Sequence, residues 1–449
     1  MMKKVLVSVF LSIVLFFNIL DANELKLKQV LIFSRHNVRY PVAVAGNLQR
    51  YTQKPWPTLS GRKGALTPKG ARLEGYMGEY FAEWFNDNEF LNAGCPDDDE
   101  VYVYTNTASR TKATARAFLD SAFKNCSVPV HHKNIDGRDP LFAPLVHNST
   151  QAYRDMVMEE IKRKVSNNEK LKKVLLELND ILNVEESDVC KEDGICDLTE
   201  PKNSLTYEVG KKLWVHGPLM IANYVMDFFV MSYYNGLPIK DIAWGNIRSK
   251  EKWKEMTELG RQDHDIKYRT VAEDIGAPLM NYLRETFHNY DNKPKLILLV
   301  GHDYNLNSIT TNMGFQPIDL PKQFEKFPIG GKLVFQRWTD DENDFLKVEY
   351  VYPSWSQLRC GKKYSRTAPP QKVVMKLNWC SDKTGLCPWN EFISNNALIS
   401  LELLKKKMKT ESGLFYRLSF YCQYNDVWTS NAHHWGPLPH CFLGILDLK

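Results

Sequence analysis

The stretch that decides the fold of this 449-residue chain begins as an apolar run and ends as a basic motif, Leu31-Ile32-Phe33-Ser34-Arg35-His36-Asn37-Val38-Arg39-Tyr40-Pro41. Residues 29–33 have the composition of a short buried β-strand. Side chains at the carboxyl end of a strand in an open α/β sheet point into the crevice where ligands bind. Arginine holds phosphate with two parallel hydrogen bonds and keeps its charge. Alone, the stretch fits two readings equally: a phosphate site with His36 as nucleophile or acid–base group, or a basic surface turn.

The composition is that of an ordinary globular protein with ample material for a core. Hydrophobic residues make up 43% of the chain and charged residues 25%, and the formal net charge is only +5. No long basic tract with interleaved aromatic residues is present. We therefore expect no nucleic-acid partner, and any recognition of an anion has to be local.

The amino terminus has the pattern of a secretory signal. A short basic region at residues 1–4 precedes an apolar stretch at residues 5–20, and Ala22 stands at the expected cleavage point. An uncleaved membrane anchor is the alternative, but the stretch is short for a spanning helix and contains Asn18. We expect residues 1–22 to be removed from an exported protein, which is periplasmic if bacterial and otherwise secreted, with no membrane partner after cleavage.

Nine cysteines are typical of a protein from an oxidising compartment. Three pairs lie close together or bracket one strand–helix unit, namely Cys95 and Cys126, Cys190 and Cys196, and Cys380 and Cys387. Connectivity cannot be deduced from spacing alone. The odd number leaves at least one thiol without an internal partner among Cys360, Cys422 and Cys441. A zinc site is the alternative, but the paired Cys-x-x-Cys spacing of zinc ribbons is absent.

Residues 24–150 alternate between predicted strands and helices. Thr67 and Pro68 are typical of a helix N-cap and first turn, and apolar residues at helical spacing predict a core-facing helix over residues 71–86. A strand is predicted at residues 101–104 and a helix at residues 112–123. Arg110 lies at the start of that helix, where arginine and the helix amino terminus both favour an anion. A solvated capping arginine is the alternative.

Residues 151–257 differ in character from the segment before them. Lysine and glutamate become more frequent, strand-like runs disappear, and helices are predicted at residues 152–166, 169–182 and 204–234. We interpret residues 152–257 as a helical domain inserted into an α/β domain made of residues 23–151 and 258–449. His216 and Asp227 lie in this insertion, and neither is assigned a functional role.

A second core strand is predicted at residues 295–300, and it leads into Gly301, His302 and Asp303. A phosphate held by arginines and a histidine needs a proton donor for the leaving alcohol, and Asp303 is a suitable group. Its surroundings would have to raise its pKa for that role. A turn with polar ends is the alternative for this tripeptide taken alone.

Taken together, these motifs resemble the histidine acid phosphatase family, whose signature is Arg-His-Gly-x-Arg-x-Pro early in the chain and His-Asp late. The resemblance is closest to the bacterial periplasmic glucose-1-phosphatase and phytase branch, in which Asn also occurs after the histidine, as Asn37 does here. Further matching segments are residues 66–70, 109–111, 301–305, 328–338 and 348–352. The resemblance covers roughly residues 25–400, so residues 401–449 form an atypical carboxyl-terminal extension.

The resemblance implies a large α/β domain with a central mixed sheet flanked by helices, plus a smaller inserted helical domain. It implies a phosphomonoesterase that needs neither metal nor cofactor, with His36 as the nucleophile that forms a phosphohistidine and Asp303 as the proton donor. The implied phosphate ligands are Arg35, Arg39, Arg110 and His302. The resemblance also supports the three cysteine pairs named above.

The expected partner is a phosphorylated small molecule, and three functions are open. The first is hydrolysis of small phosphorylated sugars such as glucose 1-phosphate. The second is a broader acid phosphatase or phytase acting on inositol phosphates, which Asn235 favours because the glucose-1-phosphatase branch has an acidic residue there. The third is an inactive phosphate- or sugar-binding paralogue, which the presence of all six site residues disfavours. A phosphoglycerate mutase also shares Arg-His, but the exported, cysteine-rich context disfavours it. A homodimer is one option for the assembly.

Overall fold

The computed structural model describes residues 25–395 except for residues 44, 93, 136, 138, 201–202, 291–292, 366 and 383. The expected signal at residues 1–22 lies outside the described residues, and so does the extension at residues 401–449 with Cys422 and Cys441. The described residues belong to one compact unit. No helix in this described part of the chain is both long and apolar enough to cross a membrane.

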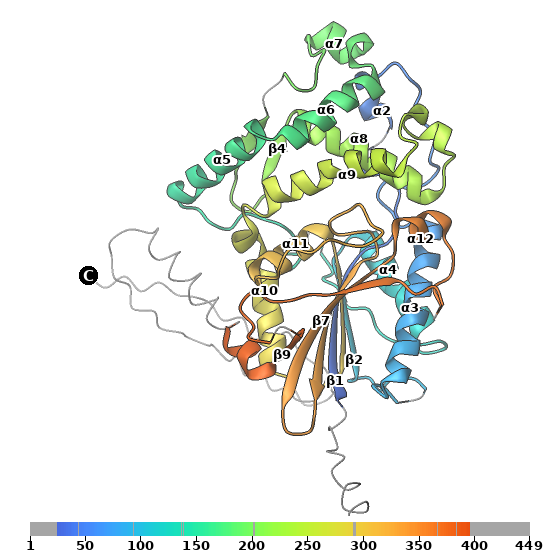
Figure 1. The fold of residues 1–449 in the computed structure, drawn as a ribbon, viewed down its shortest axis with the longest axis vertical. Helices are drawn as coiled ribbons and strands as arrows, with labels where there is room; N and C mark the ends of the chain where they lie inside the picture. The colour runs from blue at the N-terminus through green and yellow to red at the C-terminus, as the bar shows by residue number, and fades with distance from the viewer. Residues whose placement is uncertain are drawn as a thin grey trace, which may run out of the picture. The chain divides into compact units, whose positions relative to one another are not determined.

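A mixed seven-stranded sheet forms the centre of the α/β part (Figure 1), which confirms the expected fold class. The strand order is β2-β5-β1-β6-β7-β8, and β9 pairs with β7. The strands are β1 (Lys26–Arg35), β2 (Val101–Thr105), β5 (Leu296–Gly301), β6 (Lys332–Thr339), β7 (Asp344–Tyr352), β8 (Gln371–Val374) and β9 (Leu386–Pro388). β1, β2 and β5 are mutually parallel, whereas β6 pairs antiparallel with β1 and β7.

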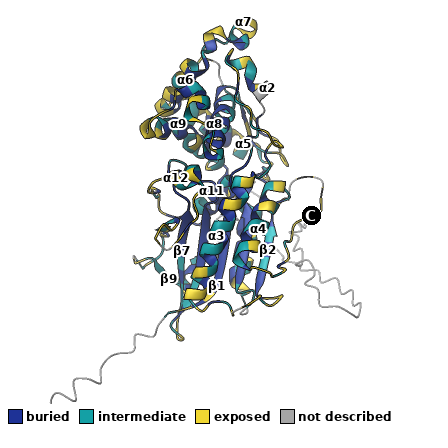
Figure 2. Ribbon diagram, turned by 90° about the vertical axis from the view of Figure 1, so that its right-hand side faces the viewer, coloured by how far each residue is buried: buried dark blue, intermediate teal, exposed yellow. Residues whose placement is uncertain are grey.

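Helices cover both faces of the sheet because the side chains of β1 alternate between them. Val30 and Ile32 belong to the core beneath α3 (Pro68–Asp87) and α4 (Ser109–Ala122). Leu31 and Phe33 belong to the core beneath α10 (Ala272–His288) and α11 (Asp303–Asn312). Figure 2 shows the sheet as a mostly buried layer between helices whose outer faces are exposed. A continuous apolar run is typical of a strand covered on both faces.

Helix α3 starts at the predicted N-cap and supports the loop after β1. The Thr67 hydroxyl accepts a hydrogen bond of 3.0 Å from the Gly70 backbone N–H, and Pro68 is the first helical residue. A Cβ on Gly70 would lie 2.0 Å from the carbonyl oxygen of Val38. Only glycine allows so close an approach, so the first turn of α3 can pack directly against the basic motif.

A helical layer lies beyond the carboxyl ends of the parallel strands (Figure 1). It consists of α5 (Gln151–Ser166), α6 (Glu169–Leu182), α7 (Asp188–Asp193), α8 (Pro218–Asn235) and α9 (Lys250–Asp263). Helix α9 continues past the expected boundary at residue 257. Short helical segments complete the described part, namely α2 (Ala45–Leu48), η2 (Gln49–Tyr51), η3 (Val184–Glu186), η4 (Ile239–Gly245), η5 (His264–Tyr268) and α12 (Trp355–Cys360).

The prediction of one helix over residues 204–234 is wrong in its first half. A two-stranded hairpin of β3 (Ser204–Thr206) and β4 (Trp214–His216) precedes α8. Gly210 and Gly217 have φ angles of 79° and 99°, outside the helical region, and Pro218 begins the helix. These residues interrupt the helical pattern, so His216 lies on a strand and its Nε2 contacts the Thr206 hydroxyl at 3.0 Å.

All three cysteine pairs that the resemblance supports are disulfides in the structure. The bonds join Cys95 to Cys126, Cys190 to Cys196, and Cys380 to Cys387. Cys360 is a free, exposed thiol. The bonds are in keeping with an oxidising compartment.

Candidate active site

The parallel strands bring the separate sequence motifs to one edge of the sheet. In register, Arg35 of β1 lies beside Gly301 of β5, and Val300 of β5 lies beside Thr105 of β2. The residues that follow each strand therefore meet at the carboxyl edge, as expected for parallel strands. The rings of His36 and His302 lie edge to face with centroids 5.4 Å apart. The structure thus brings the predicted histidines together.

Arg35 is held by two carboxylates and is almost fully buried. Its guanidinium lies 2.9 Å from Asp303 Oδ2 and 3.0 Å from Glu325 Oε2, and it also donates to the carbonyl oxygen of Phe327. Burial lowers the pKa of Arg35, but the charges of Asp303 and Glu325 outweigh that effect and raise the pKa above its usual value. Arg35 is therefore a permanent cation.

Arg39 is clamped by a carboxylate from the helical layer. Asp227 of α8 accepts hydrogen bonds of 2.6 Å and 3.1 Å from the two terminal nitrogens of Arg39, and its Oδ2 also accepts from the Val42 backbone N–H at 3.0 Å. The Asn235 side chain donates to the carbonyl oxygen of Arg39 at 3.1 Å. Bidentate pairing of this kind fixes orientation as well as charge. The loop after β1 is thus held by the middle and by the carboxyl end of α8.

Arg110 is the arginine of the site that has no ion pair among the described residues. Burial and the neighbouring charge of Arg39 lower its pKa to about 10, so it stays protonated near neutral pH. The Nε atoms of Arg35, Arg39 and Arg110 are all buried and have no hydrogen-bond partner among the described residues. Buried donors normally have a partner, and three such donors suit an anion.

The hydrogen bond of His36 determines which of its ring nitrogens is free. Nδ1 lies 2.9 Å from the carbonyl oxygen of Asn37. Because a carbonyl can only accept, we assign the proton to Nδ1, which leaves the lone pair on Nε2. Burial, then the charges of Arg110 and Arg39, lower the pKa of His36 well below 6.5. His36 is therefore a neutral imidazole with an unprotonated Nε2.

The same reasoning gives His302 the same tautomer as His36, with its proton on Nδ1. Asn106 accepts a hydrogen bond from the Thr107 N–H through its Oδ1, so its Nδ2 donates to His302 Nε2 at 2.8 Å. The proton of His302 is then on Nδ1, which lies 3.4 Å from a terminal nitrogen of Arg110. Burial, then the charge of Arg110, lower the pKa of His302. Two donors that face each other at this distance are satisfied by one anionic oxygen between them.

Asp303 is ionised in this arrangement, which differs from the raised pKa that a proton donor needs. Burial raises the pKa of its carboxyl group, but the charge of Arg35, assisted by the nearby His264, outweighs burial and holds the pKa well below its usual range. His264 Nε2 lies 3.8 Å from Asp303 Oδ2. The position of Asp303 at the first residue of α11 also favours a negative charge.

A pocket of about 240 Å³ adjoins Arg35, Arg39 and Asp303. Residues of α8, α9, η5 and the segment 325–327 line its other sides, so it lies between the sheet edge and the helical layer. Three further carboxylates line this pocket, those of Asp227, Asp263 and Glu325. A phosphate at the arginines would therefore place the rest of its molecule in a partly enclosed space that offers carboxylate oxygens as hydrogen-bond acceptors.

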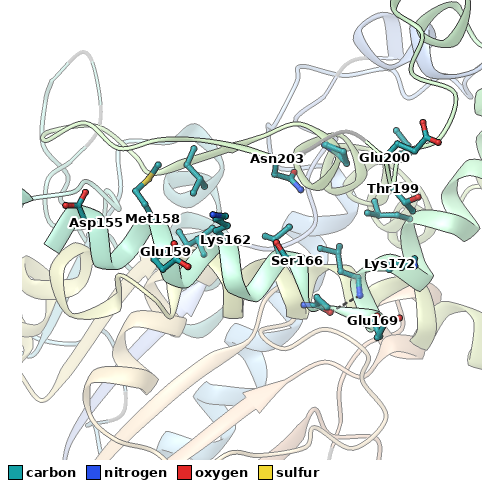
Figure 3. Close-up of a pocket in the computed structure, with 18 residues that line it drawn as sticks. Asp155, Met158, Glu159, Lys162, Ser166, Glu169, Lys172, Thr199, Glu200 and Asn203 are labelled. Atoms are coloured by element: carbon teal, nitrogen blue, oxygen red, sulfur yellow. Dashed lines mark hydrogen bonds between the residues drawn. The ribbon is translucent and has the colours of Figure 1, made fainter. Parts of the chain in front are cut away.

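A larger cavity lies elsewhere and contains none of the six predicted site residues. It measures about 950 Å³ and lies between α5, α6 and the segment before β3 (Figure 3). Its charged lining includes Asp155, Lys162 and Lys172. Arg35, Arg39 and Asp303 line the smaller pocket, so the candidate site is identified by these side chains and not by the volume of a cavity.

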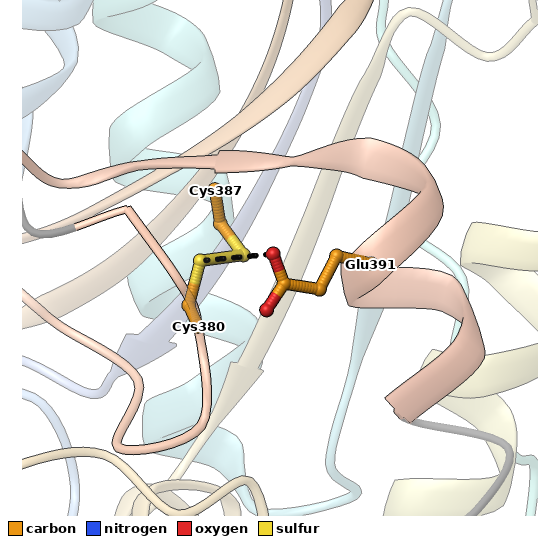
Figure 4. A group of neighbouring side chains, drawn as sticks. All are labelled: Cys380, Cys387 and Glu391. Carbon is orange, nitrogen blue, oxygen red and sulfur yellow. Dashed lines mark hydrogen bonds between the residues drawn. A yellow bond between two sulfur atoms is a disulfide. The ribbon is translucent and has the colours of Figure 1, made fainter.

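One group in the described part of the chain has the spacing of metal ligands, and it is not a metal site. Cys380, Cys387 and Glu391 lie together near β9 (Figure 4). The two sulfur atoms are joined in a disulfide, so neither is a thiolate that could bind a metal. The Glu391 carboxylate accepts from the Ser381 N–H at 2.9 Å and from its hydroxyl at 2.6 Å.

All six predicted site residues are gathered at this edge, but sequence reasoning missed the residues that hold them. Asp227 was left without a role, and Glu325, His264 and Asn106 were not singled out. Buried arginine requires a paired carboxylate, so the need for Asp227 and Glu325 was readable from the motif. Their positions were not, because they lie 188 and 290 residues from their arginine partners.

Comparison with known proteins places these features in a family. Residues 26–195 match the sequence profile of the histidine phosphatase superfamily (branch 2). The glucose-1-phosphatase of Providencia rettgeri is 40% identical over 382 residues, which cover 82% of this chain and 91% of that protein. That of Salmonella typhimurium is 38% identical over 379 residues, with the same coverage. The apo form of Hafnia alvei phytase superposes with a TM-score of 0.76 at 27% identity, over 84% of this chain and 97% of that chain. The chain therefore belongs to branch 2 of the histidine phosphatase superfamily and is a histidine acid phosphatase similar to glucose-1-phosphatases.

Proposed function

We propose that this protein is an exported, metal-independent acid phosphomonoesterase that releases phosphate from small phosphorylated sugars such as glucose 1-phosphate. The observation that carries the proposal is the neutral His36 ring, which has an unprotonated Nε2 and lies close enough to Arg110 and Arg39 for their charges to lower its pKa. In the proposed roles His36 is the nucleophile and Asp303 the proton donor. The phosphate ligands are Arg35, Arg39, Arg110 and His302.

The reaction then has two balanced steps. His36 Nε2 attacks phosphorus, the bond from phosphorus to the ester oxygen breaks, and that oxygen takes the proton of Asp303. Water next attacks the phosphohistidine, gives a proton to the Asp303 carboxylate, and releases phosphate with neutral His36. Phosphoryl transfer depends mainly on positioning and charge stabilisation. Three arginines supply the cationic environment that a metal ion supplies in other phosphatases.

Substrate binding itself would raise the pKa of Asp303 and so favour its protonation. The pKa of the free carboxyl group is low chiefly because the charge of Arg35 outweighs burial. A phosphate anion beside Arg35 shares that positive charge and adds negative charge next to Asp303. Both effects raise the pKa of a carboxyl group. An acidic medium assists the same protonation, which is in keeping with an acid phosphatase.

The pocket next to the arginines supports a small, singly phosphorylated substrate. Carboxylates accept hydrogen bonds from sugar hydroxyl groups, and Asp227, Asp263 and Glu325 supply such acceptors. Each of these carboxylates is paired with a cation, and of the further cations in the lining Lys326 is paired with Asp265 at 2.7 Å. The similarity to two glucose-1-phosphatases points the same way.

A broader phytase-like activity is the second candidate. Asn235, which stands where the glucose-1-phosphatase branch has an acidic residue, carries no charge to repel a polyphosphate. The structural similarity to a phytase also supports this candidate. An inactive paralogue is disfavoured because each of the six residues is present.

Three predictions about organisation belong to the same proposal. Residues 152–257 form a cap domain over the site, which the helical layer beyond the carboxyl edge supports. Residues 1–22 direct export, with the periplasm as destination in view of the bacterial relatives. The assembly of two copies of this chain into a homodimer stays a prediction, which a molar mass from sedimentation analysis would test.

The proposal is tested with purified protein and three substrates at acid pH: glucose 1-phosphate, inositol hexakisphosphate and p-nitrophenyl phosphate. We expect a higher kcat/KM for glucose 1-phosphate than for inositol hexakisphosphate. We also expect the activity to be undiminished in EDTA. Preference for inositol hexakisphosphate would establish the second candidate. Activity that EDTA removes and a divalent metal restores would refute metal independence, and no hydrolysis of any ester would identify an inactive paralogue.

A further inference from the structure

Behind the nucleophile lies a fully buried ion pair that the mechanism above does not use. Lys332, the first residue of β6, and Glu74 of α3 are 0% and 1% exposed, and their Nζ–Oε1 distance is 2.7 Å. The lysine also donates to the Ser34 hydroxyl at 2.9 Å and to the carbonyl oxygen of Gly330 at 3.3 Å. Its three N–H groups thus each have an acceptor. A buried ion pair often stabilises a fold no better than apolar residues of similar shape. Stability alone therefore does not explain why the Lys332–Glu74 pair lies beside the site.

The second oxygen of Glu74 connects this pair to the basic motif. Glu74 Oε2 accepts a hydrogen bond of 2.7 Å from the Asn37 side-chain amide. Asn37 Oδ1 in turn accepts from the Val38 N–H at 2.8 Å, and the Asn37 N–H donates to the Thr114 hydroxyl at 3.1 Å. The orientation of the amide follows from these partners, because a carboxylate can only accept and a backbone N–H can only donate.

Asn37 is also the residue that orients the nucleophile. Its carbonyl oxygen accepts the hydrogen bond from His36 Nδ1 at 2.9 Å, which sets the tautomer and restrains the orientation of the ring. A continuous chain of contacts therefore runs from Lys332 through Glu74 and Asn37 to His36. Asn37 stands where the family signature has glycine, and glycine could make only the backbone part of this chain.

We propose that Lys332, Glu74 and Asn37 act as positioning residues that hold the His36 ring in its attacking orientation, an inference that rests on His36 being the nucleophile. The competing explanation is that main-chain contacts alone fix His36. Its N–H donates to the Gly301 carbonyl at 3.1 Å, and its own carbonyl accepts from the Gly330 N–H at 3.1 Å. In that case the ion pair is only a part of the core.

Two variants distinguish positioning by these side chains from fixation by main-chain contacts alone. Neither variant leaves one member of the ion pair buried without the other. Asn37→Ala removes the link, and the double variant Lys332→Met with Glu74→Leu replaces the ion pair by apolar side chains of similar size. We expect both to lower the rate constant of the p-nitrophenolate burst by about 10- to 100-fold, since a small misplacement of a reacting group costs about that much. The inhibition constant of inorganic phosphate should change less than about threefold, because the arginines are untouched.

Combining Asn37→Ala with the double variant gives a sharper test than either variant alone, because it shows whether their effects on the burst rate add. If the three residues act as one chain, adding Asn37→Ala to the double variant should lower the burst rate by less than about twofold further. Gln336→Met is the matched control, because Gln336 lies on the same strand, is 1% exposed, and donates to the Glu349 carboxylate at 2.8 Å away from the site. We expect this control to keep the wild-type burst rate.

The outcomes distinguish this inference from the proposed function. A wild-type protein that hydrolyses p-nitrophenyl phosphate with a burst supports His36 chemistry, whatever the variants do. A folded double variant with a wild-type burst rate would overturn the positioning role alone, and so would an equal loss in Gln336→Met. If the double variant does not fold, Asn37→Ala decides, and a wild-type burst rate there overturns the inference. A wild-type protein that does not hydrolyse p-nitrophenyl phosphate at all would overturn both proposals.

Discussion

Arg35 and Asp303 form an ion pair of 2.9 Å that joins the ends of two neighbouring parallel strands. One partner is a proposed phosphate ligand and the other the proposed proton donor. The pair therefore links the binding of phosphate to the protonation of the leaving group, because any anion that draws charge from Arg35 also changes the pKa of Asp303.

Asp303→Asn tests this link through the leaving group. We expect kcat/KM to fall by about 10²–10⁴-fold for an alkyl phosphate, whose leaving oxygen needs a proton, as is common for general acid catalysis. p-Nitrophenyl phosphate should lose far less, since nitrophenolate leaves without help. Equal losses on the two esters, measured by steady-state kinetics, would remove Asp303 from the role of proton donor.

His36→Ala tests the covalent step. The variant lacks the only proposed nucleophile, so turnover should fall to the background rate and no phosphoenzyme should accumulate. Rapid quenching with a radiolabelled substrate, followed by a check for an acid-labile, base-stable adduct, measures this directly. The finding that would contradict the mechanism is normal turnover, or a labelled adduct, in the absence of the imidazole.

The depressed pKa of His36 predicts an unusual pH profile for phosphorylation. Burial and the charges of Arg110 and Arg39 favour the neutral ring, so Nε2 keeps its lone pair as the pH falls through the ordinary value of 6.5. We expect the burst rate constant to show no loss around pH 6.5 and to decline only at clearly lower pH. Stopped-flow measurements from above to well below pH 6.5 test this. A burst rate constant that falls with a midpoint near pH 6.5 would contradict the lowered pKa of His36.

The same pKa shift has a consequence for stability with a definite sign. The folded pKa of His36 lies below the unfolded value, so the unfolded chain binds a proton that the folded protein does not. The free energy of unfolding should be undiminished above about pH 6.5 and should decrease as the pH falls below that value. Relative to wild type, His36→Gln should show a weaker dependence on pH in this window, as measured by chemical denaturation. If the free energy of unfolding depended on pH identically in His36→Gln and in wild type, the lowered pKa of His36 would be contradicted.

Asp227→Ala tests the clamp between the helical layer and the basic motif. The change leaves the Arg39 guanidinium, only 9% exposed, without its bidentate partner. We expect a loss of about 1–3 kcal/mol in the free energy of unfolding, together with a higher KM. The control is Asp120→Ala, which removes the exposed ion pair with Arg116 and should change stability by less than about 1 kcal/mol. Equal effects in the two variants would show that Asp227 has no special role.

Much of the site was predictable because its residues follow strong local patterns. The apolar run at residues 29–33 indicated β1, and the run at residues 295–300 indicated β5, each within a few residues of the observed ends. Histidine and arginine directly after such strands indicated a ligand site, because parallel strands end at a common edge. The hairpin before α8 was missed because its two strands are only three residues long and carry no pattern of their own.

The sequence by itself therefore predicted the main strands and helices that carry the motifs, the six candidate site residues and the resemblance to the family. Hydrophobic periodicity and motif order are properties of neighbouring residues, and both can be read along the chain. Only the tertiary structure decided how these residues are paired and charged. Asp303 is ionised and His36 neutral because Arg35 and Arg110 stand beside them in an interior largely closed to water, and solvation and Coulomb interaction depend on distances in space. The basic motif after β1 is thus a predicted phosphate site, and its partners across the fold set the protonation that its chemistry requires.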